Sequence, residues 1–377
     1  MSTAWMVLVP VLGLALFDTI AGLRARGFGH KYTGARYGDF TVLVPIYGNT
    51  KYLENVDYLA RYGGRVVLCT TAGETGEFNR DLNAIADQYG FRVYRSPSKV
   101  TTGSGQRATS GTTRDRIIRD ALRNAVTTEY VVMLDADSTT QRDFAELIGE
   151  VHEDRHDVVS VRLVIRDEPN WLVKVQRHEY RLAMQLRFLA PWLVSGACHA
   201  GRTVAMRDVM NRHSLFFQGN DIELGVIAKT IGYRVGHIPF EVATSAPNNL
   251  KAWWRQRLAW SGGEFRLFIT NLRFVIWHPF FWLYGAVVAI GTFPFRWAAV
   301  THPGLPLAGA AAIYYLLVVW LHWRSRDRWI LLMPVYTLFS SLVLTPIGAF
   351  AYLRMVVKHR NAGVIRPHLR LARHMPS

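Results

Sequence analysis

Charged residues are distributed so unevenly along this 377-residue chain that no single solvent suits all of it. The segments 1–23 and 274–353 carry only six charged side chains between them, whereas residues 24–273 carry 34 basic and 26 acidic ones. Half of the residues are hydrophobic, yet the formal net charge is +16. The composition excludes intrinsic disorder, a collagen-like repeat and a disulfide scaffold. The sequence therefore predicts a polar folded domain joined to apolar segments that span a membrane.

The first apolar segment, Trp5–Leu23, has the length of one transmembrane helix and is followed directly by basic residues. No basic region precedes it, so we predict a retained anchor over 1–25 rather than a cleaved signal peptide. Basic residues after a span favour the cytoplasmic side, and the two cysteines, Cys69 and Cys198, suit a reducing compartment. We therefore expect a multi-pass protein of the plasma membrane whose polar domain is cytoplasmic.

A C-terminal transmembrane region is predicted over 274–353, in three apolar stretches: Phe274–Phe295, Leu305–Trp323 and Trp329–Leu353. The basic tail, 354–377, has six basic and no acidic residues, which favours the cytoplasm, although a fourth crossing would place it outside. Pro334 and Pro346 offer one resolution, because they would break the last stretch into a re-entrant or interfacial segment. The side of the tail stays open.

Strands alternate with helices in the polar domain, which we place at 38–250. This alternation predicts an α/β domain with a mostly parallel sheet, whose ligands bind outside the carboxyl ends of the strands. The expected strands are 41–47, 65–70, 91–94, 130–134 and 233–239. The expected helices are 51–62, 78–89, 115–125, one that begins at Phe144, and one that follows 216–223 and ends near Ile231.

Two carboxylates, Asp135 and Asp137, directly follow the expected strand 130–134. Their i, i+2 spacing at the carboxyl end of a buried strand places both in the ligand crevice. Oxygen ligands on a tight turn suit Mg²⁺ or Mn²⁺, which takes its remaining ligands from water and a diphosphate. The alternative interpretation is an ordinary turn or a helix N-cap before Phe144. The position after a clear strand favours the metal site.

A second pair of carboxylates, Asp221 and Glu223, lies at the expected start of a helix. A carboxylate in this position is either a helix cap or a general base that deprotonates an attacking hydroxyl.

The helical stretch over 250–273 is basic and aromatic. Arg255 and Arg257 can donate hydrogen bonds to diphosphate oxygens, and Trp260 can stack on a sugar ring. The alternative is a helix at the membrane surface, with arginine and tryptophan at the lipid headgroups. The amphipathic stretch 171–190 is interpreted as such an interfacial, structural helix.

The order of these motifs resembles that of membrane-bound, inverting family 2 glycosyltransferases, such as hyaluronan, chitin and cellulose synthases, over about residues 40–353. Asp135-Ala-Asp137 is similar to the family's Asp-x-Asp motif, and Gly219-Asn-Asp221 to its Gly-Asp/Glu-Asp motif. Gln256 and Trp260 match two positions of the Gln-x-x-Arg-Trp motif. The resemblance implies the fold of the nucleotide-diphospho-sugar transferases, which is called GT-A-like.

The resemblance also implies a role for each candidate residue. Asp221 would be the catalytic base, in preference to Glu223, and Asp135 and Asp137 would hold the metal. The donor would be bound by Asp135, Tyr47, Thr70, Arg114, Gln256, Arg257 and Trp260. The acceptor would be bound by Ser195, Gly196 and Cys198, which lie where the family has an acceptor segment, and by Trp260.

One departure from the family pattern concerns the diphosphate. Ala259 replaces the arginine of the Gln-x-x-Arg-Trp motif, so Arg257 or Arg255 would have to hold the diphosphate.

Two further departures concern the base and the nucleotide. Asn220 replaces an acidic residue beside Asp221, which lowers the negative charge around the expected base. The strand 65–70 is not followed by the aspartate that usually binds uracil, which leaves Thr70 or Glu74 for recognition of the nucleobase.

The function implied by the resemblance is transfer of a sugar from a UDP-sugar, with Mg²⁺ or Mn²⁺, to a growing β-linked polysaccharide that is exported through the membrane region. Two alternatives stay open: single-sugar transfer to a membrane lipid, as in ceramide-glucosyltransferase-like enzymes, and a non-catalytic export subunit. Membrane lipids are expected partners and nucleic acid is not, because the basic excess lies beside the apolar segments. The sequence does not define the oligomeric state.

Overall fold

The computed structural model describes residues 16, 19–25, 31–97, 111–213, 215, 219–270, 297, 301, 304–322 and 327–358. These residues divide into two compact units that alternate along the sequence. The sheet unit comprises residues 30–166 and 191–245, and the helical unit comprises 167–190, 246–358 and the N-terminal segment. Residues 167–190, which the sequence analysis included in the polar domain, thus belong to the helical unit.

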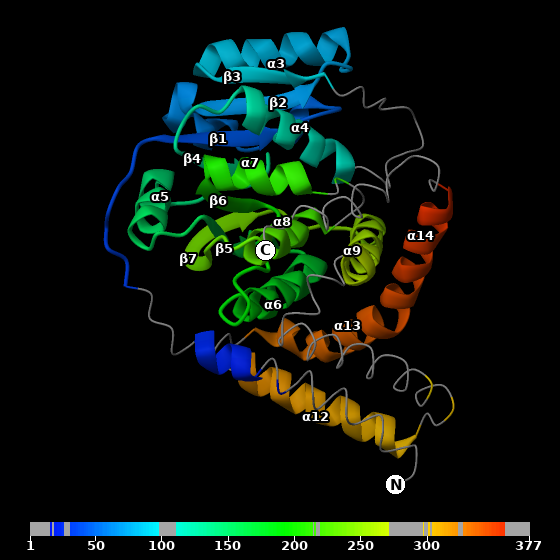
Figure 1. Ribbon diagram of the computed structural model, residues 1–377. Helices are drawn as coiled ribbons and strands as arrows, with labels where there is room; N and C mark the ends of the chain where they lie inside the picture. The colour runs from blue at the N-terminus through cyan, green and yellow to red at the C-terminus, as the bar shows by residue number, and fades with distance from the viewer. Residues whose placement is uncertain are drawn as a thin grey trace. The chain divides into compact units, whose positions relative to one another are not determined.

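Seven strands of the described chain form one sheet in the order β3-β2-β1-β4-β6-β5-β7 (Figure 1). β6 (Cys198–Arg202) is antiparallel to both of its neighbours, and the other ladders between these strands are parallel. The sheet is mixed but mostly parallel, which confirms the predicted α/β class. The other strands are β1 (Phe40–Pro45), β2 (Val66–Thr71), β3 (Arg92–Ser96), β4 (Tyr130–Leu134), β5 (Val158–Ile165) and β7 (Val235–Thr244).

The first four predicted strands are confirmed as β1 to β4, with ends shifted by at most two residues, and the fifth is confirmed as β7. β5 and β6 are not among the strands predicted from the sequence. β5 is rich in β-branched residues and carries an ordinary strand pattern. β6 reads Cys-His-Ala-Gly-Arg, a composition with little strand preference, so its conformation depends on pairing with β4 and β5.

β1 is buried on both faces, as its continuous apolar run predicts. Leu43 belongs to a core cluster that includes buried residues of α4, α7 and α8. Phe40 packs edge-on against Tyr62, which stacks on Phe144, and Phe144 stacks on Phe240. Helices and aromatic side chains thus cover the two faces of the sheet, and the strand ends stay available for a site. The longer helices of the described sheet unit are α3 (Gly76–Tyr89), α4 (Gly111–Asn124), α5 (Phe144–Glu153), α7 (Thr203–Arg212) and α8 (Asn220–Thr230).

The predicted helix over 51–62 is wrong. The segment forms three short pieces instead: η2 (Thr50–Tyr52), α2 (Val56–Leu59) and η3 (Ala60–Arg65). The backbone N–H groups of Glu54 and Asn55 donate to the carbonyl oxygen of Ala136, so they are not used in a continuous helical ladder. The turn after β4 therefore interrupts the helix.

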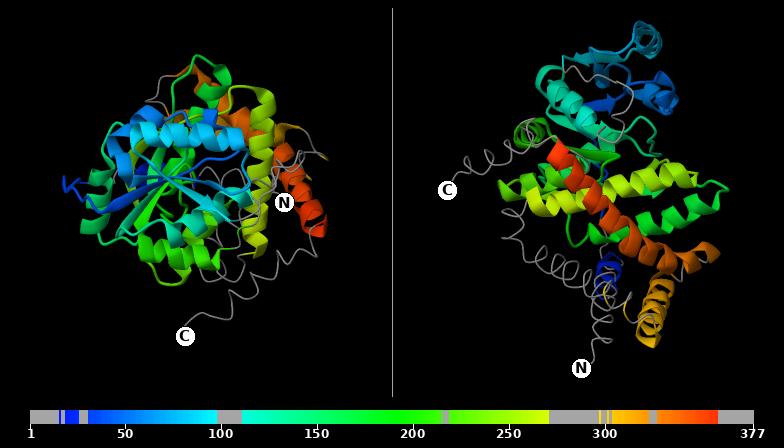
Figure 2. Two further views of the ribbon diagram at one scale, coloured as in Figure 1. Left: turned by 90° about the horizontal axis from the view of Figure 1, so that it is seen from above. Right: turned by 90° about the vertical axis from the view of Figure 1, so that its right-hand side faces the viewer.

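In the helical unit, α14 packs along α9 (Figure 2). A Cβ atom on Gly348 would lie 2.7 Å from the Cβ of Ser261, which shows how closely the two helices approach. Pro334 stands in the first turn of α13, where the missing N–H costs little, whereas Pro346 lies two residues after the π-helical turn η7, and the helical conformation continues through both prolines. Among the described residues after the N-terminal segment, the helices of this unit are α6 (Trp171–Leu186), α9 (Leu250–Thr270), α12 (Leu305–His322), η6 (Arg328–Leu332), α13 (Met333–Phe339), η7 (Ser340–Leu344) and α14 (Thr345–Lys358).

Within the part of the chain that the structure describes, no helix is both long enough and apolar enough to cross a membrane. The spans predicted over 305–323 and 329–353 fall in α12 and in the segment from η6 to α14, and they gain no support from this result. The spans predicted at 5–23 and 274–295 and the basic tail lie wholly or mostly outside the described residues.

Gly225 lies in the interior of α8, where glycine costs about 1 kcal/mol relative to alanine. A Cβ at this position would lie 1.9 Å from the carbonyl oxygen of Trp192 and 2.7 Å from Cγ2 of Val194. We predict that Gly225→Ala lowers the free energy of unfolding by about 1–3 kcal/mol, because overpacking outweighs the gain in helix propensity. Chemical denaturation measures the change.

The matched control is Gly76→Ala in the first turn of α3, where a Cβ would meet only the flexible side chain of Arg80, at 3.7 Å. We expect a change within about 0.5 kcal/mol there. Equal effects of the two substitutions would contradict the close approach at Gly225.

Candidate active site

The Asp-x-Asp turn lies at the carboxyl end of β4, and hydrogen bonds hold its backbone. The N–H of Asp135 donates to the carbonyl oxygen of Ala197 at 2.8 Å, which joins the end of β4 to the turn before β6. The side-chain amide of Asn55, a residue only 2% exposed, donates to the carbonyl oxygens of Asp135 at 3.0 Å and Ser138 at 2.7 Å. The turn therefore presents its two carboxylates from a rigid backbone.

Asp137 is partly buried beside Asp135, and its Oδ1 accepts hydrogen bonds from Ser138 Oγ at 3.1 Å and Thr244 Oγ1 at 3.4 Å. Burial raises the pKa of Asp137, and the negative charge of Asp135 raises it further. A divalent cation would offset the repulsion between these two carboxylates. Two carboxylate ligands leave the remaining positions of Mg²⁺ or Mn²⁺ to water and diphosphate oxygens, so the donor set fits such an ion. Among the described residues, no three His, Cys, Asp or Glu side chains form a metal site by themselves.

Arg114, on α4, connects the Asp-x-Asp turn to the loop before β6. Its Nε and Nη2 atoms donate to Oδ1 of Asp135 at 3.0 and 2.7 Å, and Nη2 also donates to the carbonyl oxygen of Gly196 at 2.7 Å. Nη1 lies 3.6 Å from Oδ1 of Asp115. Burial lowers the pKa of Arg114, but the charges of Asp135, Asp115 and Asp221 raise it by more. The guanidinium thus stays charged among three carboxylates.

Asp221 lies in the first turn of α8, which begins after Gly219 in the left-handed conformation, with φ of 88°. Its carboxylate lies against the backbone of Gly196, because a Cβ there would come within 3.0 Å of Asp221 Oδ2. Gly196 is also the residue whose carbonyl oxygen accepts from Arg114. The structure therefore brings the predicted base next to the ion pair of Arg114 and Asp135.

Asn220, which replaces the acidic residue of the family motif, has a carboxylate partner. Its side-chain amide donates to Oδ2 of Asp115, and both residues are buried. Nδ1 of His213 accepts from the N–H of Leu215 at 3.0 Å, so the proton lies on Nε2, which donates to the carbonyl oxygen of Asn220 at 2.8 Å. Asn220 thereby ties the start of α8, which carries Asp221, to α4.

The other predicted donor-binding residues of the sheet unit lie at the ends of β1 and β2. Tyr47 is partly buried, and burial raises its pKa while the nearby charge of Arg114 opposes the shift. Thr70 is fully buried, and within the described residues its Oγ1 has no hydrogen-bond partner. Glu74 accepts a hydrogen bond from the N–H of Gly48 at 3.1 Å. Tyr47 and Glu74 therefore lie at this end of the sheet, and Thr70 is buried one residue before the end of β2.

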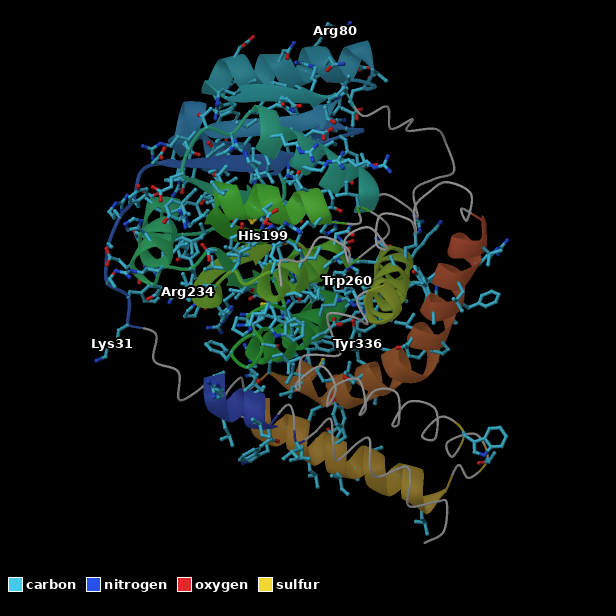
Figure 3. The ribbon with its side chains drawn as sticks, in the orientation of Figure 1. Lys31, Arg80, His199, Arg234, Trp260 and Tyr336 are labelled. Atoms are coloured by element: carbon cyan, nitrogen blue, oxygen red, sulfur yellow. The ribbon has the colours of Figure 1, made fainter. Side chains whose placement is uncertain are left out.

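The predicted acceptor segment turns most of its side chains into the sheet unit. Ser195 is fully buried and donates from Oγ to the carbonyl oxygen of Val161 at 2.9 Å. Cys198 is fully buried in β6, and burial raises the pKa of its thiol. His199, labelled in Figure 3, bonds through Nδ1 to the carbonyl oxygen of Ser195 at 2.9 Å, and burial lowers its pKa to about 3. Acceptor binding by Ser195 and Cys198 stays a prediction, and Gly196 is the member of this segment that meets Asp221.

Gln256, Arg257 and Trp260 belong to α9 in the helical unit, with Trp260 and Tyr336 labelled in Figure 3. Arg257 is 3% exposed, and its guanidinium donates to Glu179 Oε2 at 2.5 Å, Tyr336 OH at 2.9 Å and Gln256 Oε1 at 2.6 Å. It also lies over the Trp260 ring, 4.2 Å from the ring centre. Burial lowers the pKa of Arg257, but the charge of Glu179 raises it by more. The donor-binding roles of these three residues stay predictions.

Sequence reasoning missed Asn55, Asp115 and His213. Asp115 follows Arg114 directly, and its charge beside a predicted donor-binding residue was a usable signal. Asn55 and His213 act on backbone oxygens, and Asn55 reaches across 80 residues of sequence, so their residue types carry no signal for these roles.

Residues 130–353 match the glycosyl transferase family group 2. The chain belongs to this family. The match begins at β4 and includes both Asp-x-Asp and Asp221, so the predicted membership of family 2 is confirmed. The narrower resemblance to hyaluronan, chitin and cellulose synthases stays a prediction.

A solved structure of another protein has a similar fold. It is a mannosyltransferase from Pyrobaculum calidifontis in complex with GDP-Man and Mn²⁺, with a TM-score of 0.58 and 16% identity, covering 90% of this chain and 99% of that one. This similarity confirms the GT-A-like fold. An N-acetylglucosaminyltransferase from Rhizobium meliloti (strain 1021) is 27% identical over 154 residues, which are 37% of this chain and 36% of that protein. The chain thus matches little more than a third of that relative's length.

The contact between Asn220 and Asp115 leads to a charge-exchange prediction. Asn220→Asp places two buried carboxylates against each other, and we expect it to lower the free energy of unfolding by about 1–3 kcal/mol at neutral pH. The double variant Asn220→Asp/Asp115→Asn restores a carboxylate and an amide with their places exchanged, and should recover most of the loss. Chemical denaturation of the wild type, both single variants and the double variant completes the cycle. Additive losses in the double variant would show that the two side chains are not energetically coupled.

Proposed function

We propose that the protein is an inverting glycosyltransferase that moves a sugar from a UDP-sugar to the end of a growing β-linked polysaccharide. The observation that carries this proposal is the Asp221 carboxylate, held beside the Asp135 turn through Gly196 and Arg114. A candidate base and a candidate diphosphate-binding turn thus lie at one end of one sheet, as transfer from a nucleotide-sugar requires.

The proposed reaction is a single displacement at the anomeric carbon of the donor. Asp221 accepts the proton of the acceptor hydroxyl as the hydroxyl oxygen forms its bond to that carbon. The bond from the carbon to the diphosphate breaks on the opposite face, so the configuration inverts and UDP leaves. Asp135 and Asp137 would hold a divalent cation that neutralises charge on the leaving diphosphate.

The donor class is supported by the bound GDP-Man and Mn²⁺ of the structurally similar mannosyltransferase. The choice of UDP rests on the resemblance to polysaccharide synthases. The partial relative is an N-acetylglucosaminyltransferase, so UDP-N-acetylglucosamine is the first sugar donor to test.

Two acceptors are compatible with the motifs: the end of a polysaccharide and a membrane lipid. Both would be used at a membrane, and the charge-poor segments 1–23 and 274–353 support that location. The polysaccharide is preferred because the motif order resembles the synthases over most of the chain.

We predict that Asp221→Asn lowers sugar transfer by about 10²- to 10⁴-fold, because the amide cannot accept the acceptor proton. The assay measures UDP release with Mn²⁺ and each of several UDP-sugars and GDP-mannose, followed by mass analysis of the product. The control is Asp208→Asn, which removes a carboxylate that pairs with Arg212 on α7 and should leave the rate unchanged.

Three results would redirect this proposal. A single sugar added to an extracted lipid replaces the polysaccharide reading with the lipid-acceptor one. Release of GDP but not UDP changes the donor. If the wild type releases no nucleotide and Asp221→Asn behaves identically, the remaining hypothesis is a non-catalytic export subunit.

We also predict that the full-length protein sediments with membranes of the expressing cell and stays there after an alkaline carbonate wash, because the apolar segments would be embedded. Detergent should release it. Immunoblotting measures how much of the full chain is in the wash and how much is in the pellet. A soluble cytoplasmic marker, measured in the same fractions, is the control. Recovery of the full chain in the carbonate wash would argue against embedding in the membrane.

A further inference from the structure

Arg114 makes more contacts at this site than its position in the sequence suggests. Two of its nitrogen atoms donate to the same oxygen, Oδ1 of Asp135, and a second bond from Nη2 reaches the carbonyl oxygen of Gly196. The side chain of Arg114 is 20% exposed and that of Asp135 is 36% exposed, so solutes can reach the pair. This ion pair is therefore accessible rather than sealed in the core.

The same carboxylate is one of the two that fit a divalent cation. A guanidinium on Asp135 opposes such a cation in two ways: it occupies an oxygen ligand, and its positive charge repels the ion at short range. Arg114 and the cation therefore compete for Asp135.

A guanidinium displaced from Asp135 would need another anion, and a diphosphate is one. The planar guanidinium presents a fork of N–H donors that matches two oxygens of a phosphate group. In the helical unit, the other candidate, Arg257, already donates to Glu179, Tyr336 and Gln256, and it is 3% exposed. Because Ala259 replaces the motif arginine and Arg257 is already engaged, Arg114 is the better supported diphosphate ligand.

We propose that Arg114 is an exchangeable counter-ion of Asp135, which a divalent cation displaces from the carboxylate and which then pairs with the diphosphate of the donor. This inference rests on the proposed function and adds to it an order of events: metal and nucleotide binding are coupled through one side chain. Asp115, 3.6 Å from Nη1, would keep the guanidinium near the site while it changes partners.

The test separates competition from a structural role, because the two predict opposite signs for metal affinity. For Arg114→Gln without nucleotide, we expect Mn²⁺ to bind about tenfold more tightly than to wild type, since the competitor is removed. With Mn²⁺ saturating, we expect UDP to bind about 10- to 100-fold more weakly, since charge-assisted hydrogen bonds are lost. Electron paramagnetic resonance of free Mn²⁺ and isothermal titration with UDP measure the two affinities on the full chain.

The matched control is Arg119→Gln, which removes an arginine of the same helix that pairs with Asp120 at 3.3 Å and should change neither affinity. Arg114→Lys keeps the charge but loses the fork, so Mn²⁺ affinity should stay within about threefold of wild type while UDP affinity falls to an intermediate value. This variant carries the test if Arg114→Gln does not fold.

Weaker binding of both Mn²⁺ and UDP by Arg114→Gln would show a structural role and overturn the inference. Unchanged Mn²⁺ affinity would overturn the competition with the metal. Failure of wild type to bind either Mn²⁺ or any nucleotide would instead overturn the proposed function itself, and with it this inference.

Discussion

The antiparallel strand β6 is the constraint on which the candidate site depends. It enters between β4 and β5 with Leu134 opposite Cys198, which brings the turn at 195–197 alongside the end of β4. The hydrogen bond from Asp135 to Ala197 secures this approach. Because Gly196 has no side chain, the Asp221 carboxylate can lie against its backbone. A parallel strand in this place would send its preceding turn to the other end of the sheet, away from the Asp-x-Asp turn.

Charge balance is the second constraint at this place. The carboxylates of Asp135, Asp115 and Asp221 all lie near enough to Arg114 to raise its pKa. An aspartate at position 220 would add a further buried carboxylate, whereas the amide present there donates a hydrogen bond to Asp115. The departure from the family motif is thus explained by the neighbour that this chain supplies on α4. Burial raises the free energy of ionised carboxylates, and the hydrogen bonds donated by Arg114 and Asn220 offset part of that cost.

Much of the fold could be predicted because parallel strands that are buried on both faces have continuous apolar sequences. The same logic placed Asp135 and Asp137 at a strand end, since they follow β4 directly. It failed at 51–62, where the backbone donors of Glu54 and Asn55 are taken by Ala136 far along the chain. It also failed at β6, whose short sequence has little strand preference of its own. Local pattern is a poor guide wherever the partner of a backbone group is distant in sequence.

The sequence by itself determined the α/β class, through alternating strand and helix patterns, and membership of family 2, through short contiguous motifs. Only the tertiary structure decided which charges meet. Arg114 reaches Asp135 and Gly196 across 21 and 82 residues, and Arg257 is engaged by Glu179 across 78. These pairings depend on strand register and helix packing, which bring together side chains that no local periodicity connects.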